Sequence, residues 1–298
     1  MVFAARQLQE KCQEQHRDLY TAFIDLTKAF DTVSREGLWK IMAKYGCTEK
    51  FIRIVQQLHE GMHARVQDQG ELSEPFPVLN GVKQGCVIAP TLFSIMFSAM
   101  LTDAFRDGNI GVNIKYRTDE KLFNPRRLHA KTKIDTIRDL LFADDFALTA
   151  NTEADLQTSM NRFSQACSNF GLTINTEKSE VMYQPAPGKV YAKPNITTSG
   201  RKLKVVDRFT YLGSTLSQNV TIDDEINTRI SKASSTFGRL HRNVWHRCGI
   251  GQATKLKVYR AVVLPVLLHA CETWTVYQRH ARKLNHFHTV YLRKIMNI

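Results

Sequence analysis

The chain has 298 residues, of which 43% are hydrophobic, and its 41 Lys and Arg exceed its 28 Asp and Glu by a formal charge of +13. This length and apolar content exclude a disordered, collagen-like or coiled-coil protein and suffice for one large or two small domains. The cysteines are scattered, the start does not resemble a signal peptide, and no apolar run is as long as a bilayer span. We therefore expect an intracellular protein that is not bound to a membrane, in the nucleus or the cytoplasm.

The positive charge is concentrated in the last quarter of the chain. Residues 226–298 contain 13 Lys or Arg and one acid, Glu272, whereas the residues before Ile226 contain 28 Lys or Arg and 27 Asp or Glu. Such a surplus in one region favours a polyanionic partner, with nucleic acid ahead of a membrane surface. The alternative is an ordinary solvated basic surface.

The hydrophobic pattern of the first hundred residues predicts both helices and strands. Glycine and the polar residues that cap helices mark the boundaries. In chain order the predicted elements are a helix ending near 17, a buried strand over 19–26, helices over 38–45 and 49–59, a hairpin around 68–70 and a buried helix over 90–105.

The middle of the chain is polar and then returns to short apolar runs. Residues 113–138 have no clear period, so we expect a loop or insertion there. Residues 138–148 predict a tight hairpin with two acids at its tip. The later predicted elements are a helix over 152–170, short strands at 172–175, 180–183 and 209–212, and helices from 218 to the end.

Three aspartates lie where isolated acids are unfavourable. Asp25 ends a buried strand, and Asp144 and Asp145 are adjacent at the hairpin tip. Acids in such places repel one another and lose hydration unless a cation accompanies them. Hard oxygen donors from neighbouring strands suit Mg²⁺, and two ions could assist an in-line phosphoryl transfer. The alternative is an exposed Asp–Asp turn with Asp25 as a helix cap.

Five segments in order resemble motifs of the reverse transcriptases, most clearly those of the non-LTR (LINE-type, endonuclease-encoding) retrotransposons of animals. The first four resemble successive palm motifs and the fifth resembles the primer-grip motif. They are AFIDLTKAFDTVSR (22–35), GVKQGCVIAPTLFSIMF (81–97), FADDFAL (142–148), GLTINTEKSEVM (171–182) and YLGSTLS (211–217).

The resemblance implies an α+β fold of the right-hand polymerase type. Residues 1–218 would form a palm, an antiparallel sheet backed by helices with a remnant of the fingers, and residues 219–298 an all-helical basic thumb. The family's basic strands upstream of the first motif have no counterpart here, so we expect the fingers to be largely missing.

The resemblance also implies the catalytic residues. Asp25, Asp144 and Asp145 match the metal-binding aspartates, and the backbone carbonyl of Leu26 would complete the ligands of two Mg²⁺ ions, with Mn²⁺ as an alternative. Lys178 matches a lysine thought to protonate the leaving pyrophosphate, although an exposed lysine without this role is the competing interpretation.

Further positions match residues that contact substrates. Phe30 matches the bulky residue that excludes a ribose 2′-hydroxyl, with simple core packing as the alternative. Lys83, Gln84 and Gly85 match residues near the incoming dNTP and the templating base, or they form a glycine-bearing turn into a helix. The residues that match the primer grip are Tyr211, Leu212 and Gly213.

The function implied is RNA-directed DNA synthesis, in which a primer 3′-hydroxyl attacks the α-phosphate of a dNTP. The partners would be an RNA template, a DNA primer and dNTPs, with the RNA–DNA duplex on the basic helices after Ile226; the sequence does not define an oligomeric state. One alternative is an inactive retrotransposon remnant that only binds nucleic acid.

A less favoured alternative is a zinc hydrolase. The segment His59-Glu60-Gly61-Met62-His63 is a literal His-Glu-x-x-His motif, which requires both imidazoles on one face of a continuous helix. Gly61 lies inside the motif and a predicted strand follows it, so we expect the helix to end there.

Overall fold

The computed structural model describes residues 1–83, 85–106, 110–117 and 132–298. These residues form two compact units. The sheet unit comprises Asp18–Val181 and Val190–Val205, and the helical unit comprises Met1–Arg17, Met182–Lys189 and Val206–Ile298. The expected boundary between palm and thumb at residue 218 stays a prediction.

A five-stranded sheet has the order β13-β10-β1-β9-β8 and lies in the sheet unit except for the last three residues of β10. Its strands are β1 (Leu19–Ile24), β8 (Asp139–Phe142), β9 (Asp145–Ala150), β10 (Glu180–Gln184) and β13 (Lys204–Val205). Every residue of β1 is buried, which agrees with its apolar sequence.

The sheet is mixed. Strand β9 pairs antiparallel with both β1 and β8, but β13 pairs parallel with β10. The α+β class is therefore confirmed, whereas the expectation of a purely antiparallel sheet was wrong. The physical reason is that the short β13 reaches the sheet through a long connection, which permits a parallel pairing that a tight hairpin does not.

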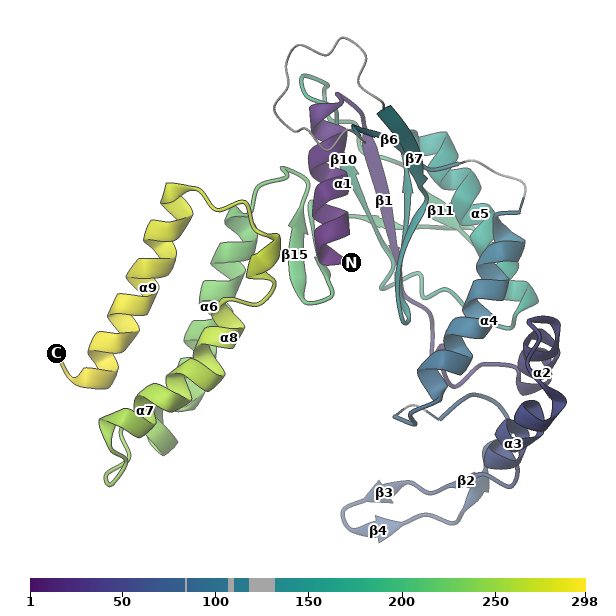
Figure 1. Cartoon of the computed structure of the whole chain (residues 1–298), viewed down its shortest axis with the longest axis horizontal. Helices are drawn as coiled ribbons and strands as arrows, with labels where there is room; N and C mark the ends of the chain where they lie inside the picture. The colour runs from purple at the N-terminus through teal and green to yellow at the C-terminus, as the bar shows by residue number, and fades with distance from the viewer. Residues whose placement is uncertain (84, 107–109, 118–131) are drawn as a thin grey trace. The chain divides into compact units, whose positions relative to one another are not determined.

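Two helices cover the sheet, α4 (Ala89–Ala104) and α5 (Glu153–Asn169). Helix α5 packs on β1 and β9 and also contacts α4. Figure 1 shows α4 and α5 on the same part of the sheet unit. Thr152 begins α5 by accepting a hydrogen bond from the backbone N–H of Asp155. Stacked rings join α5 to the sheet, because the ring centroids of Phe146 in β9 and Phe163 in α5 are 4.5 Å apart.

The sheet unit also contains α2 (Arg35–Lys44), α3 (Glu49–His59) and several two-residue strands. The side chains of Ser34 and Thr48 cap the two helices. The strands pair as β2 (His63–Ala64) with β5 (Phe76–Pro77), β3 (Gln67–Asp68) with β4 (Glu71–Leu72), and β11 (Thr197–Thr198) with β12 (Arg201–Lys202).

The loop expected over 113–138 was wrong where the structure describes it. Strand β6 (Val112–Arg117) pairs antiparallel with β7 (Thr132–Ile137), and Thr136 Oγ1 donates to Asn113 Oδ1 across the pair at 2.7 Å. Residues 118–131 lie outside the described part of the chain. Val112 and Ile114 are buried and alternate with exposed residues, which is a half-buried strand pattern obscured by the surrounding charge. The strand expected at 172–175 is reduced to one bridge between Leu26 and Ile174.

The helical unit begins with α1 (Val2–Glu14) and contains the hairpin of β14 (Arg208–Tyr211) and β15 (Ser214–Ser217). Every later described element is helical: α6 (Asp223–Arg239), η1 (His241–Trp245), α7 (Gln252–Val258), η2 (Tyr259–Val263), α8 (Leu264–Leu267), η3 (Cys271–Thr273) and α9 (Gln278–Met296).

The core of these helices is aromatic and aliphatic. Its buried members include Phe237, Trp245, Tyr259 and Phe287, and the rings of Phe237 and Trp245 stack at 4.5 Å. Within the described residues, none of the helices combines the length and the apolar character needed to cross a membrane.

Candidate active site

The register of the sheet brings the three predicted aspartates to one end of it. Ile24 pairs with Phe146, so the next step of the antiparallel ladder places Asp25 opposite Asp145. Asp145 also pairs with Phe142 of β8, which leaves Ala143 and Asp144 as a two-residue turn.

The electrostatics of this end reflect the closeness of the acids. The pKa of Asp145 is raised, first by burial and then by the negative charges of Asp144 and Asp25. On the other side of Asp25, the ammonium of Lys178 lies 3.8 Å from its Oδ2 atom. Lys178 is exposed and paired with an aspartate, which places the predicted general acid beside the carboxylates.

The backbone of Asp25 is held by the segment that follows α5. Its N–H donates to the hydroxyl of Ser179 at 3.1 Å, and its carbonyl accepts from the N–H of Asn175 at 2.9 Å. The Asn175 side chain accepts in turn from the N–H of Glu177 at 3.1 Å, an Asx turn that shapes the loop carrying Lys178. Sequence reasoning missed Asn175 and Ser179, although both lie inside the fourth motif.

The Leu26 carbonyl takes no part in these contacts. The bridge to Ile174 is flanked by hydrogen bonds from Asn175 to Asp25 and from Thr27 to Thr173, and neither uses Leu26. Because successive carbonyls of an extended chain alternate in direction, we expect that of Leu26 to point away from the Ile174 segment.

Whether these groups suit a divalent metal ion depends on their chemistry. The carboxylates are hard oxygen donors, and a cation would relieve the burial and the mutual repulsion that raise the pKa of Asp145, in that order; both features favour Mg²⁺. Throughout the described ranges, no three His, Cys, Asp or Glu side chains form a ready-made metal cluster. The oxygen atoms of these carboxylates fit Mg²⁺ chemically, although among the described residues they are not already gathered into a three-residue metal cluster.

Phe30 lies on the loop between β1 and α2, with its ring against the core. The ring stacks on that of buried Phe93 at 4.5 Å between centroids, and the Phe30 carbonyl accepts from the N–H of Val82 at 2.8 Å. Phe30 remains partly exposed, so it has both a packing contact and an open side.

The second motif lies next to this loop through Val82. Lys83 and Gly85 are exposed, Gly85 has a φ of +87°, and Gln84 lies outside the described residues. The left-handed backbone at Gly85 favours glycine, in agreement with the predicted turn.

Arg35 joins the two motifs and was not singled out from the sequence. Its guanidinium donates to the carbonyls of Gly81 at 2.9 Å, His59 at 3.0 Å and Asn80 at 3.2 Å. Burial lowers the pKa of Arg35. The sequence carries little signal for this role, because the acceptors are backbone groups distant along the chain.

The structure does not provide what the zinc alternative needs. Helix α3 ends at His59, and Gly61 then takes a φ of +64° before His63 begins β2. His59 is buried, with Nδ1 2.8 Å from the carbonyl oxygen of Val55. The two imidazoles therefore do not share one face of a continuous helix.

The predicted primer-grip residues lie in the helical unit, at the turn between β14 and β15. Tyr211 pairs with Ser214, and Leu212 and Gly213 form the turn with φ values of +48° and +78°. These positive values match the two-residue turn typical of hairpins. Tyr211 is buried.

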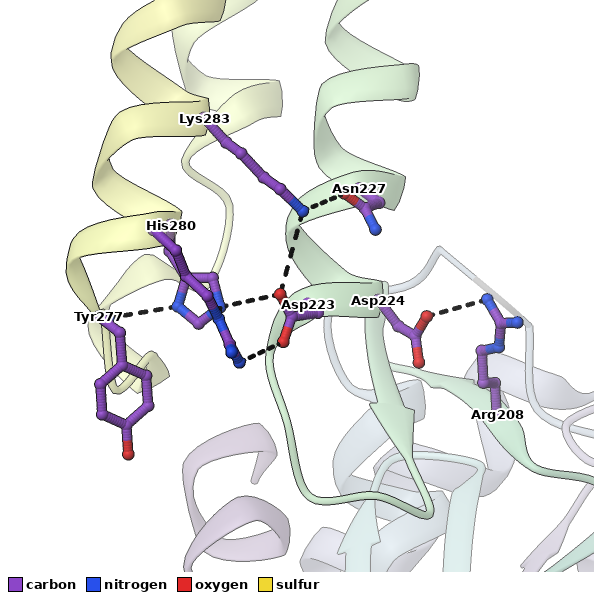
Figure 2. Close-up of polar contacts among 8 residues, drawn as sticks. Arg208, Asp223, Asp224, Asn227, Tyr277, His280 and Lys283 are labelled. Carbon is purple, nitrogen blue, oxygen red and sulfur yellow. Dashed lines mark hydrogen bonds and ion pairs between the residues drawn. The ribbon is translucent and has the colours of Figure 1, made fainter.

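A polar cluster joins the starts of α6 and α9 within the helical unit. Asp223 accepts hydrogen bonds from Arg279 at 2.7 Å and from His280 at 3.1 Å, and Lys283 lies 4.0 Å away (Figure 2). Burial acts to raise the pKa of Asp223, but the His280 hydrogen bond and the neighbouring positive charges outweigh it and lower the pKa.

Adjacent carboxylates at a strand end are typical of enzymes that transfer phosphoryl groups with divalent ions. The family model for "Reverse transcriptase (RNA-dependent DNA polymerase)" matches residues 2–216. The chain belongs to the reverse transcriptase family, and within it the chain has distant homology to the polymerases of non-LTR retrotransposons.

Two relatives from Drosophila melanogaster illustrate this homology. The Pol polyprotein of the type-2 retrotransposable element R2DM is 25% identical over 289 residues, which cover 95% of this chain and 25% of that protein. The RNA-directed DNA polymerase from the mobile element jockey is 25% identical over 285 residues, covering 92% of this chain and 28% of that protein.

Among solved structures, the chain is similar to an apo telomerase from Candida tropicalis truncated from its C-terminal domain. The TM-score is 0.47 at 15% identity, and the match covers 72% of this chain and 38% of the telomerase chain.

Proposed function

We propose that the chain carries out RNA-templated DNA synthesis, extending a primer 3′-hydroxyl with dNTPs. The single observation that carries the proposal is the register that pairs Ile24 with Phe146, because Asp25 and Asp145 are the next residues at that end of the sheet and Asp144 is in the adjoining turn. The pKa of Asp145, raised first by burial and then by the charges of Asp144 and Asp25, also supports it.

The residues of the sheet end have distinct proposed roles. Asp25, Asp144, Asp145 and the carbonyl of Leu26 would hold two Mg²⁺ ions, which would supply charge stabilisation for the attacking and leaving oxygens. Lys178, held beside Asp25, would give a proton to the departing pyrophosphate.

The substrate contacts follow from the loops around Phe30. The Phe30 ring, supported by Phe93, would occupy the space that a 2′-hydroxyl needs and thus select dNTPs. Lys83 and Gly85, together with Gln84, would contact the nucleotide and the templating base. The turn of Leu212 and Gly213, with Tyr211, would hold the primer end.

The helices after residue 218 would act as the thumb. Residues 226–298 carry 13 Lys or Arg against one acid, and many of these bases are exposed. Such a surface would follow the phosphates of an RNA–DNA duplex, which is recognised by its shape.

A primer-extension assay tests the proposal. The full chain is given an RNA template, a DNA primer, dNTPs and Mg²⁺, and compared with Asp144→Asn. We expect Asp144→Asn to lower extension at least about a hundredfold, because a ligand charge is lost where charge develops. The matched control is Asp103→Asn, which removes an exposed acid at the end of α4 and should extend normally.

The outcomes separate the two candidate functions. Equal extension by Asp144→Asn and the wild type would contradict the catalytic assignment. Duplex binding without extension by the wild type would support the binding-only alternative instead.

A further inference from the structure

The turn between β14 and β15 is held by side chains of the helices that follow it. Arg229 of α6 donates a hydrogen bond from Nη2 to the carbonyl of Gly213, and His269 Nε2 lies 3.4 Å from the carbonyl oxygen of Leu212. A Cβ on Gly213 would lie 3.2 Å from the same His269 nitrogen, so glycine permits this close approach.

A buried carboxylate links Arg229 to the strand that leaves the turn. Glu225 is fully buried, its Oε1 accepts from Arg229 Nε at 2.7 Å, and its Oε2 accepts from the N–H of Thr215 at 2.5 Å. One turn of α6 therefore contacts the hairpin at its tip, through Gly213, and in β15, through Thr215.

A third buried charge reaches the same strand from α1. Arg6 Nη2 donates to the Ser214 hydroxyl at 2.9 Å and to the Thr215 carbonyl at 3.2 Å. Arg6, Glu225 and Arg229 are respectively 6%, 0% and 4% exposed, so solvent screens their charges little. We call these three residues the buried triad.

Charges of both signs act on the buried triad. Two guanidinium groups face the Glu225 carboxylate, and in the described part of the chain no acceptor contacts Arg6 Nε. Burial lowers the pKa of Arg6, while the charges of Glu225 and Glu10 oppose this effect. Because solvent screens buried charges little, the directed bonds of the triad to the hairpin are costly to break.

We propose that Glu225 and Arg229 are positioning residues for the primer terminus, because they hold the Leu212–Gly213 turn in place. This inference rests on the proposed function, in which the turn holds the primer. It adds that the placement of the turn depends on α6, because Arg229 is bonded to the turn at Gly213 and Glu225 is bonded to β15 at Thr215.

The test replaces Arg229 by lysine. Arg229→Lys keeps the positive charge opposite Glu225, but one ammonium cannot reproduce the two directed bonds from Nε and Nη2. The matched control is Arg208→Lys, which alters the partly exposed ion pair between Arg208 of the same hairpin and Asp224 of the same helix, at 3.0 Å. Glu225→Gln serves as a second variant, retaining the shape of the side chain while removing its charge.

Two readouts are compared in the full chain. Hydrogen exchange of the backbone amides over 211–215 should accelerate about tenfold in Arg229→Lys and stay unchanged in Arg208→Lys, because only the first loosens the turn. In primer extension, Arg229→Lys should raise KM for the primer about tenfold with a smaller change in kcat, since it disturbs primer placement. If Arg229 were purely structural, Arg229→Lys would lower the midpoint of thermal unfolding without raising KM for the primer more than it changes kcat.

Each outcome decides a separate claim. Unchanged exchange over 211–215 in both Arg229→Lys and Glu225→Gln would overturn the proposal, as would faster exchange with an unchanged KM for the primer. If the wild type neither binds nor extends a primer, the proposed function fails, and the exchange rates alone decide whether Arg229 holds the turn.

Discussion

Asp25 shows how much of a candidate active site depends on residues outside its motif. The apolar strand and the terminal acid were evident from the sequence, but the hydroxyl of Ser179 and the N–H of Asn175 hold the Asp25 backbone from about 150 positions away. Their contribution could not be predicted, because serine and asparagine are also ordinary loop residues. Arg35 was also missed, because the groups that it binds are backbone carbonyls, which every residue has.

Phe30 provides the first prediction at the residue scale. Replacing Phe30 by alanine should lower the preference for dNTP over rNTP at least about tenfold, because the ring fills the space of the 2′-hydroxyl. The measurement is kcat/KM for each nucleotide in primer extension. Phe30→Tyr retains the bulk and should keep the preference, whereas equal selectivity in Phe30→Ala would show that the ring only packs on Phe93.

Gly81 provides a second prediction at the residue scale, about stability. A Cβ on Gly81 would lie 2.6 Å from the carbonyl oxygen of Asp31, and the residue has a φ of +83°. Gly81→Ala should therefore lower the free energy of unfolding by about 2–5 kcal/mol, from backbone strain and overpacking together. Urea denaturation gives the value.

A matched glycine isolates the contribution of the close contact. Gly46 has the same φ of +83°, but nothing lies within 4 Å of its added Cβ. Gly46→Ala should cost only about 1–2 kcal/mol, from strain alone. Equal losses in the two variants would show that Asp31 moves away easily.

At the scale of elements, local signals predicted the helices better than the strands. The bounds of α3 agree with the prediction because Thr48 caps its start and a glycine follows its end. Strands β6 and β7 were missed because pairing partners lie distant in the chain, and residues 113–138 are rich in charge. A strand becomes stable through its neighbour, which a short window of sequence does not contain.

The cluster at the starts of α6 and α9 yields a prediction about stability. Asp223 joins the two helices through Arg279 and His280 (Figure 2). Asp223→Asn should lower the free energy of unfolding at pH 7 by about 0.5–1 kcal/mol, a modest value because solvent screens the partly exposed pair. Urea denaturation measures it, with Glu272→Gln as an exposed acid-to-amide control.

The pH dependence of this difference follows from the lowered pKa of Asp223. A carboxylate with a depressed folded-state pKa stabilises the fold above its unfolded pKa, near ~3.9, and this contribution is lost as the pH falls through the folded value. The gap between wild type and Asp223→Asn should thus be full at pH 7 and shrink from about pH 5 downwards. A gap that stays constant to pH 3 would show that the charge of Asp223 does not matter.

At the scale of the whole molecule, charge is distributed unevenly along the chain. The excess lies after Ile226, in helices whose exposed faces carry most of the bases. Neutralising four of these bases should reduce the slope of log K against log salt for duplex binding by up to about 0.9 per lost phosphate contact. The bases are Lys232, Arg239, Arg242 and Lys257.

The control removes the same charge from the sheet unit. Four exposed bases on α2 and α3 are neutralised together, and the slope should then stay close to that of the wild type. Fluorescence anisotropy of a labelled RNA–DNA duplex gives both slopes. A larger reduction of the slope in the control variant would show that the duplex binds to the sheet unit instead. The control bases are Lys40, Lys44, Lys50 and Arg53.

The sequence by itself determined the family, the helix caps, the paired acids and the concentration of positive charge after Ile226. These features reside in consecutive residues, where spacing and residue type carry the information. Only the tertiary structure decided that Asp25 and Asp145 follow the paired Ile24 and Phe146 at one end of the sheet, and that β13 runs parallel to β10. It also decided that Arg229 bonds Gly213 and that Glu225 bonds Thr215. The reason is physical: strand register and buried ion pairs join residues distant in the chain, and their energies exist only once the chain has folded.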